Sequence, residues 1–100
     1  MYRVLRTWKV RDGTDFPVAF QWAAEVTSYV NRTHSMNLKF GFEMFGPATI
    51  HWHWDSDSID EIHQFNAKLL QDREYWGLVN KAKGYFLDGS WKDTLVGFPG

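Results

Sequence analysis

The stretch MNLKFGFEMFGPATIHWHWD, residues 36–55, contains two alternating segments separated by a turn. In residues 36–45 apolar positions alternate with polar ones or glycine, and in residues 49–55 isoleucine and tryptophan alternate with histidine. A period of two is typical of β-strands, and the Gly46-Pro47 pair between the segments favours a turn. We therefore expect a β-hairpin.

Two registers of this hairpin remain open. A connection of two or four residues places Phe40 opposite His53 and Gly41 opposite Trp52, whereas a one-residue bulge at Pro47 exchanges the faces. Large apolar residues then occur on both candidate faces: Phe40, Phe42, Met44, Phe45, Ile50, Trp52 and Trp54. An antiparallel sheet with one wet face alternates more cleanly than this. We therefore expect a second copy of the chain to cover the face that helices leave open.

The N-terminal side of the hairpin predicts a strand followed by a helix. Residues 2–11 alternate as a strand, and Asp12-Gly13-Thr14 is typical of a turn. The helix would have Thr14 or Asp15 as its N-cap and Pro17 in its first turn. It carries two apolar stripes, one of Phe16, Phe20, Ala23, Thr27 and Val30 and one of Trp22, Val26 and Tyr29. Two stripes indicate a helix that is covered from two directions.

The C-terminal side predicts two helices and a last strand. Ser58-Ile59-Asp60-Glu61 is a capping box, in which Ser58 caps the helix and Glu61 reaches back. The helical pattern that follows is too long for one ordinary helix, so we expect a break near Gln71-Asp72 and a second helix over about residues 73–85. Asp88-Gly89 predicts a turn, and residues 90–96 a strand.

The resulting order, β-α-β-β-α-β, predicts one α+β domain over residues 1–100. It is the ferredoxin-like arrangement, a four-stranded antiparallel sheet with helices on one face.

The charge and cysteine content exclude several kinds of protein. Lys and Arg number 11 and Asp and Glu number 12, without a basic stripe, so we expect no nucleic-acid partner. The absence of cysteine excludes disulfides, thiolate zinc sites, iron–sulfur clusters and a cysteine nucleophile. The N-terminal residues do not match a signal peptide, and no apolar run approaches about 18 residues. We therefore expect a cytoplasmic protein without a membrane span.

The chain has an unusually high aromatic content: six Trp, four Tyr and eight Phe make up 18% of its residues. So many rings are hard to bury in a core of this size, so some should line a pocket or contact a partner subunit. Trp52, Trp54 and Trp76 are candidate ligand-binding residues. The alternative is that the rings serve core and dimer packing alone.

His51 and His53 share one strand face, because residues i and i+2 of a strand point the same way. They could bind a metal ion with Asp55 or Glu43 as third ligand, titrate near neutral pH, or be polar residues of a barrel interior. His63, on the second helix, is a further acid–base candidate. We take His51, His53 and His63 as the candidate catalytic residues and expect neither a metal nor another cofactor.

Arg6 and Glu43 are charged residues on the expected strands. They could bind an acidic substrate or pair across a subunit interface. The chain contains neither a nucleophile elbow nor a glycine-rich phosphate loop.

The length and element order resemble the dimeric α/β-barrel superfamily over nearly the whole chain. The segment Asp72-Arg73-Glu74-Tyr75-Trp76, leading to Ala82 and Phe86, is similar to the D-x-x-Y/W segment of small members, including the NIPSNAP-like branch. The resemblance implies a homodimer that binds a small hydrophobic or aromatic ligand. Haem-degrading members need a histidine on the second helix, where His63 stands, and an asparagine on the first strand, which this chain lacks.

As a function, the resemblance implies a small-molecule-binding protein with an aromatic pocket between sheet and helices, acting as a cofactor-independent monooxygenase or an isomerase. The alternative is a non-catalytic structural or stress-type homodimer without a ligand.

Overall fold

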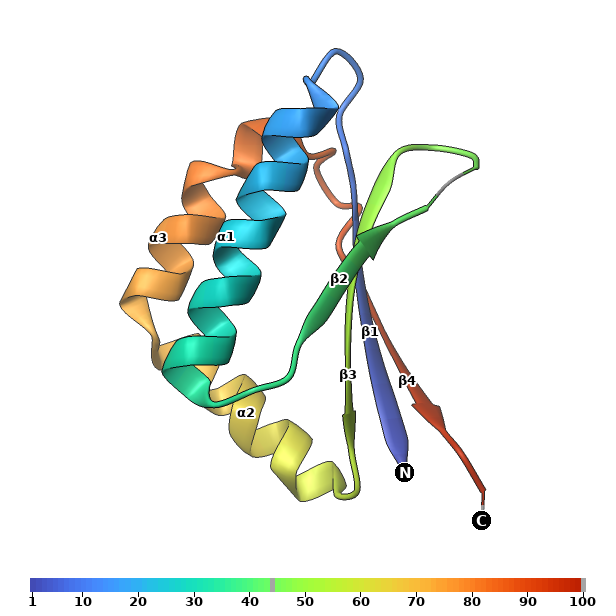
Figure 1. Ribbon diagram of the computed structural model, residues 1–100, viewed down its shortest axis with the longest axis vertical. Coiled ribbons are helices and arrows are strands. Elements are labelled where there is room, and N and C mark those ends of the chain that lie inside the picture. Colours follow the sequence, from blue (N-terminus) through green and yellow to red (C-terminus); the bar gives the residue numbers. More distant parts are fainter. Residues whose placement is uncertain (44, 100) are drawn as a thin grey trace.

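Four strands form one antiparallel sheet in the order β2-β3-β1-β4, and the helices lie together on one of its faces (Figure 1). The structure is a computed structural model and describes residues 1–43 and 45–99. The elements are β1 (Tyr2–Lys9), α1 (Phe16–His34), β2 (Lys39–Phe42), β3 (Thr49–Ser56), α2 (Ile59–Gln71), α3 (Arg73–Lys81), the 3₁₀-helix η1 (Lys83–Tyr85) and β4 (Lys92–Gly97). This arrangement confirms the predicted α+β, ferredoxin-like fold. Within the described ranges, no helix has the length and apolar character needed to cross a bilayer.

The hairpin has the second of the two predicted registers, in which the faces are exchanged. Phe40 lies opposite Trp52, Gly41 opposite His51 and Phe42 opposite Ile50. This pairing turns the large apolar residues of both strands toward the helices: Phe40, Phe42, Ile50, Trp52 and Trp54. The expectation that large apolar groups occupy both faces is therefore wrong for the described residues. The physical reason is burial, since a slip of β2 by one residue would turn Phe40 and Phe42 away from the helices and into water.

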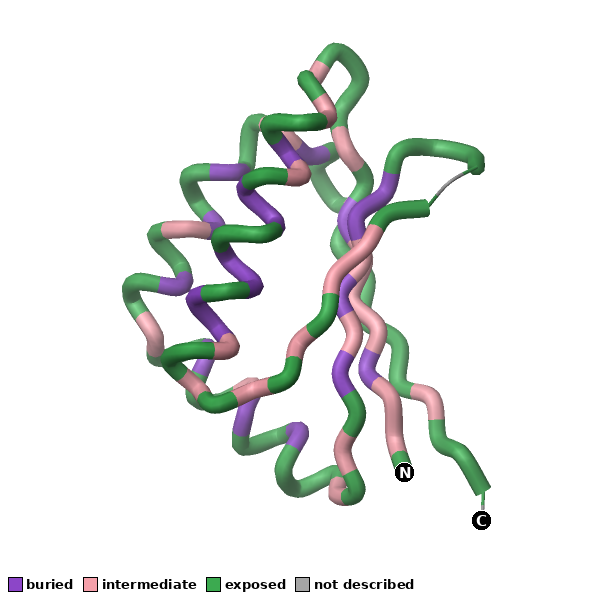
Figure 2. Tube along the Cα trace, viewed as in Figure 1, coloured by how far each residue is buried: buried purple, intermediate pink, exposed green. Residues whose placement is uncertain are grey.

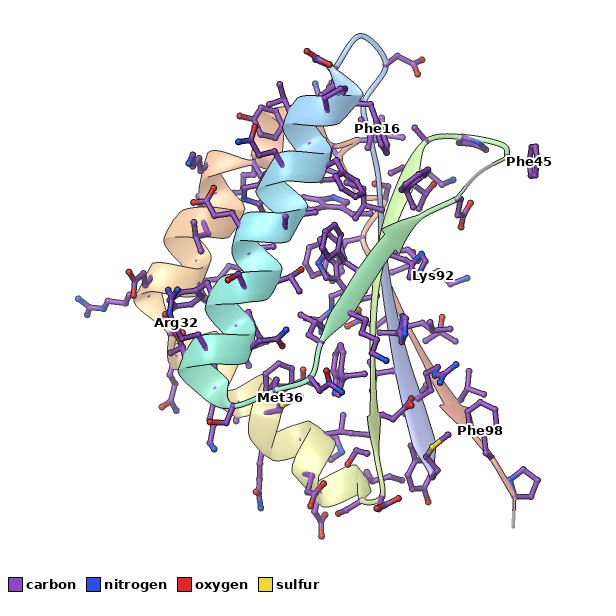
Figure 3. All side chains as sticks on the ribbon, viewed as in Figure 1. Phe16, Arg32, Met36, Phe45, Lys92 and Phe98 are labelled. Carbon is purple, nitrogen blue, oxygen red and sulfur yellow. The ribbon has the colours of Figure 1, made fainter. Side chains whose placement is uncertain are left out.

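Two of the apolar residues expected on the faces of the sheet, Met44 and Phe45, are not among these side chains. Phe45 is in the turn between the strands and is 90% exposed, and Figure 3 shows it pointing away from the rest of the molecule. Met44 lies outside the described residues. The turn passes through Gly46 at φ 90°, a backbone conformation that glycine adopts without strain.

β2 is shorter than the predicted strand over residues 36–45, because the Leu38 backbone just before it is hydrogen-bonded to Asn31 of α1 instead of to a neighbouring strand. The Asn31 side-chain amide donates to the Leu38 carbonyl at 2.9 Å, and the Leu38 N–H donates to Asn31 Oδ1 at 2.7 Å. The first and last strands are also shorter than predicted at one end. Val10 makes only an isolated bridge to Phe86, and Ser90 is held in a turn through its bonds to Leu87.

Helix α1 is covered from two directions, as its two stripes predicted. On the sheet side, the Trp52 indole donates to the Thr27 hydroxyl at 3.0 Å. On the other side, the Trp22 indole donates to the Leu78 carbonyl of α3 at 2.9 Å. In Figure 2 the buried positions accordingly line the sides of helices and strands that face each other.

The predicted cap and the predicted helix break are both present. Ser58 Oγ accepts from the Glu61 N–H at 3.3 Å, while the Glu61 carboxylate accepts from the Ser56 hydroxyl at 2.8 Å instead of reaching back to the cap residue. Asp72 separates α2 from α3 and caps α3 by accepting from the Tyr75 N–H at 3.1 Å. α3 ends earlier than predicted, at Lys81, and η1 continues as a tighter turn.

Candidate functional site

A groove of about 460 Å³ opens between the helices and the helix-covered face of the sheet. Its walls come from β1, α2, α3 and the start of β4, and include Arg6, Trp8, Asn66, Tyr75, Trp76 and Trp91. A smaller cavity of about 30 Å³ lies deeper in the core and is lined by Trp22, Trp52 and Trp54, among others. The two share Arg6, Leu69, Tyr75, Val79 and Trp91, so they adjoin.

Arg6 is a cation buried where the groove meets the inner cavity. It lies on the helix-covered face of β1, between Val4 and Trp8, and its side chain is 14% exposed. Asp93 of β4 receives two hydrogen bonds from it, Nε to Oδ1 at 2.7 Å and Nη2 to Oδ2 at 2.9 Å. Its guanidinium carbon lies 5.6 Å from the Trp54 ring and 5.2 Å from the Trp91 ring, within range for cation–π attraction.

The electrostatics of Arg6 favour a further acceptor beside it. Burial lowers the pKa of Arg6, but the hydrogen bonds and charge of Asp93 outweigh burial and raise it. The pair with Asp93 uses two of the five guanidinium N–H donors. The phenol of Tyr75 is a further hydrogen-bonding neighbour of Arg6 and raises its pKa, and Arg6 lines the groove with the donors that remain.

Tyr75 adds a neutral donor to the same place. Its side chain is buried, and burial raises the pKa of the phenol, although the charge of Arg6 opposes the change. The phenol is therefore protonated at neutral pH and can donate a hydrogen bond to a ligand.

Asp72 holds the α3 wall of the groove against α1. Its carboxylate accepts from Tyr29 Oη at 2.8 Å, from the Tyr75 N–H at 3.1 Å, and is 2.8 Å from His34 Nε2. Burial raises the pKa of Asp72, but hydrogen bonds from Tyr29, His34 and the Tyr75 N–H outweigh it, and the pKa falls below its usual range. Burial and the neighbouring Asp72 raise the pKa of Tyr29 to about 12. Asp72 and Tyr75 of the D-x-x-Y/W segment thus have separate roles, the first as a cap and the second in the groove.

The structure brings the tryptophan candidates together but separates them from the histidine candidates. Trp52 and Trp54 line the inner cavity, and Trp76 lines the groove. The Trp54 Nε1 atom is buried and has no hydrogen-bond partner in the described structure.

The histidine candidates lie elsewhere. His51 and His53 stack on the helix-free face, with ring centroids 5.7 Å apart, and His63 is exposed on α2. The pKa of His53 lies below its usual range, because burial disfavours the charged ring and Arg3 and His51 repel it. Among the described residues, no group of three or more His, Asp or Glu could hold a metal ion.

Sequence reasoning missed Asn66, Tyr75, Trp91 and Asp93 as groove residues. It left open whether Arg6 binds a substrate or pairs across an interface, and within the chain Arg6 pairs with Asp93. The sequence did contain a signal for the role of Arg6. It shares its strand face with Val4 and Trp8, and a charged residue on an apolar face needs a partner there. The partner Asp93 follows from the pairing of β1 with β4, which the sequence did not specify.

The fold and the position of the groove define the class of protein as a ferredoxin-like α+β protein with a small-molecule-sized groove between sheet and helices. No family model and no curated protein matches the sequence. Solved structures do match in fold, and the likeness confirms the predicted ferredoxin-like fold.

A NIPSNAP family protein of unknown function from Agrobacterium tumefaciens is 18% identical, with a TM-score of 0.78 over 96% of this chain and 86% of that one. An uncharacterised NIPSNAP domain protein from Burkholderia xenovorans is 13% identical, with a TM-score of 0.80 over 99% and 95%. SnoaB from Streptomyces nogalater, a cofactor-independent oxygenase, is 10% identical, with a TM-score of 0.63 over 97% and 91%.

Proposed function

We propose that the protein binds a flat, mostly apolar small molecule that carries an acidic or carbonyl oxygen, in the groove between the sheet and the helices. The observation that carries the proposal is Arg6, a buried cation with spare N–H donors at the junction of groove and inner cavity. Small-molecule sites are typically apolar clefts of roughly 300–1,000 Å³ with a few polar groups that orient the ligand. The groove, at about 460 Å³, has that size and that composition.

The lining of the groove suits such a ligand. Trp8, Trp76 and Trp91 supply ring surfaces against which a flat molecule can pack. Arg6 and Tyr75 supply donors to an oxygen, and hydrogen bonds to a charged oxygen are stronger than neutral ones in a partly dry site.

For the reaction we propose cofactor-independent monooxygenation, which is supported by the shared fold of the oxygenase SnoaB. The substrate would lose the proton of an acidic ring hydroxyl or enol to water in the groove, and Arg6 would stabilise the resulting anion. The anion is electron-rich enough to reduce O₂ itself. Overall, a CH₂ group and O₂ become a C=O group and water, with all electrons supplied by the substrate. An isomerase would use the same anion without O₂, so oxygen consumption separates the two reactions.

The test combines ligand detection with matched variants. Native mass spectrometry of the purified protein reports any retained molecule, and calorimetry measures binding of 2-hydroxy-1,4-naphthoquinone, a flat probe with an acidic hydroxyl. The double variant Arg6→Gln/Asp93→Asn removes the cation without leaving its partner charged, and should weaken binding by about tenfold or more. The control His53→Gln, on the other face of the sheet, should bind as the parent does. Unchanged affinity in the double variant, or no ligand and no binding at all, would leave the non-catalytic homodimer as the better account.

We also propose that the protein is a homodimer, paired through the helix-free face of the sheet. The centre of this face holds half-buried Leu5, Thr7 and Val96, which a partner would cover. A permanent interface of this kind should bury on the order of 2,000 Å² or more. Sedimentation at micromolar concentration should give a dimer for the parent and for Lys68→Glu on α2, and a monomer for Leu5→Glu. A monomeric parent would contradict the proposal.

A further inference from the structure

A second depression, of about 270 Å³, lies at the margin of the helix-free face, where β3 extends beyond β2. β2 begins at Lys39, opposite His53, so the next residues of β3 have no partner in β2. The segment 35–37, which connects α1 to β2, passes beside this free edge. We call the depression the cationic notch, and its charged or titratable lining residues are Arg3, Lys39, His53 and Asp55.

The wall formed by the connecting segment is held in place by α1. The Met36 N–H donates to the Asn31 carbonyl at 3.3 Å, and the Asn31 side chain exchanges two hydrogen bonds with the Leu38 backbone. The segment enters the notch through Ser35, at φ 53°, whose N–H also bonds Asn31. A site with such fixed walls loses little conformational freedom when a ligand binds.

The charges of the notch leave an excess of positive charge. Arg3 and Asp55 face each other on β1 and β3 and form a two-pronged pair at 2.8 and 3.1 Å, so they neutralise each other. Lys39 is exposed, and within the described residues no carboxylate lies within ion-pair distance of it. His53 would add a second cation on protonation.

Each neighbour of His53 contributes to its electrostatics. Burial, Arg3 on β1, His51 on β3 and Lys39 on β2 all lower the pKa of His53, and Asp55 alone among the named neighbours raises it. A bound anion would add a negative charge beside this ring and reverse the balance. Trp54 also lines the notch.

We propose that the cationic notch binds a small oxyanion of the phosphate type, free or as the end group of a phosphomonoester, and that binding is coupled to protonation of His53. Phosphate fits better than a carboxylate, because its second negative charge matches the second positive charge that His53 gains. This site lies on the opposite side of the sheet from the groove and stands independently of the proposed groove ligand. It lies at the margin of the helix-free face, and none of Leu5, Thr7 and Val96, at the centre of the proposed dimer contact, lines it.

The experiment is an NMR titration of the full-length chain with inorganic phosphate at constant ionic strength. Saturable shifts should be confined to Arg3 and to residues 35–39 and 53–55, and the pKa of His53 should move upward in saturating phosphate. Glycerol phosphate is the second probe: tighter binding than inorganic phosphate points to a phosphomonoester, and weaker binding points to free phosphate. Shifts that never saturate, or that spread evenly over the surface, would overturn the proposal.

The variants separate a specific site from general attraction to positive charge. Lys39→Gln should weaken phosphate binding by about tenfold. Lys92→Gln is the matched control, since Lys92 is also exposed and lies on the same side of the sheet (Figure 3), and it should bind phosphate as the parent does. His53→Gln should retain binding at pH 8 and lose the increase in affinity on acidification. Equal losses in Lys39→Gln and Lys92→Gln would contradict a defined notch.

Discussion

The two faces of the sheet differ in chemistry although the same strands form both. On β1, Val4 and Trp8 point to the helices with buried Arg6 between them, while Arg3 and Leu5 point to the free side. The difference shows what the alternation of side chains along a strand achieves. It separates an aromatic layer around Arg6 on one face from a polar surface that carries His53 on the other. A ligand that needs ring surfaces belongs on the first face, and a small anion belongs on the second.

The largest expected difference between the faces is in packing. Phe86 is fully buried, stacks on Trp8 at 4.0 Å between ring centroids and meets Trp22 edge-on at 5.3 Å. Phe86→Ala should therefore lower the free energy of unfolding by about 3–5 kcal/mol, because it removes ring contacts and leaves a cavity. Lys39→Ala, at an exposed position on the margin of the helix-free face, should cost less than about 1 kcal/mol. Urea denaturation measures the free energy of unfolding of both variants. Similar losses would show that the two faces of the sheet do not differ in packing.

A second, smaller effect is expected where a polar group holds the helix layer together. Asp72→Asn replaces the carboxylate that accepts a hydrogen bond from Tyr29 and contacts His34. These two largely buried side chains then lose a charged acceptor. The free energy of unfolding should fall by about 1–3 kcal/mol. Asp60→Asn, on the exposed first turn of α2, is the matched control and should change it by less than about 0.5 kcal/mol. A loss in Asp72→Asn no larger than in the control would show that the Asp72 contacts do not hold α3 in place.

A third substitution should change stability in the opposite direction. Gly77 lies inside α3, and an added Cβ would meet no atom within 4 Å, so Gly77→Ala should stabilise the protein by about 0.5–1 kcal/mol. In Gly41→Ala the new methyl would lie 3.1 Å from His51 Cε1, so the imidazole must move and the gain should be absent. Thermal melts give the stabilities, and the NMR signals of the His51 ring report its displacement. A Gly41→Ala variant with unmoved His51 signals would argue against the pairing of Gly41 with His51.

The smallest expected effect is the pH dependence of the helix-free face. Because the pKa of His53 is lowered in the folded state, the unfolded chain binds more protons once the pH falls below the ordinary value of about 6.5. Stability should then decline from about pH 6.5 downward, until the pH passes the lowered pKa. His51→Gln/His53→Gln should lose less stability between pH 7 and 5 than the parent. Parallel losses in the two proteins would show that the lowered pKa of His53 does not cause the decline.

Much of the fold could be predicted because its signals are local. The period of two in β3, the two stripes of α1, the Ser58 cap and the break at Asp72 each depend on residues close in sequence. The register of the hairpin could not be predicted, because both registers satisfy the alternation and only the packing of Phe40 against α1 distinguishes them.

The candidate site was predicted less well than the fold, because it is built from distant elements. The tryptophans of β3 and α3 were found from composition and position, and the histidines that share β3 with two of them turned out to face the other way. The pair of Arg6 with Asp93 joins residues 87 positions apart, and depends on which strands become neighbours in the sheet.

The separation of the two faces depends most directly on how β2 pairs with β3, and NMR can measure that pairing. Cross-strand proton contacts should link Phe40 with Trp52 and Gly41 with His51, as the register requires. Contacts that instead link Phe40 with His53 and Gly41 with Trp52 would place the phenylalanines of β2 on the same face as the histidines of β3. That result would contradict the separation of the aromatic face from the histidine face, and the position of Lys39 beside His53 in the cationic notch.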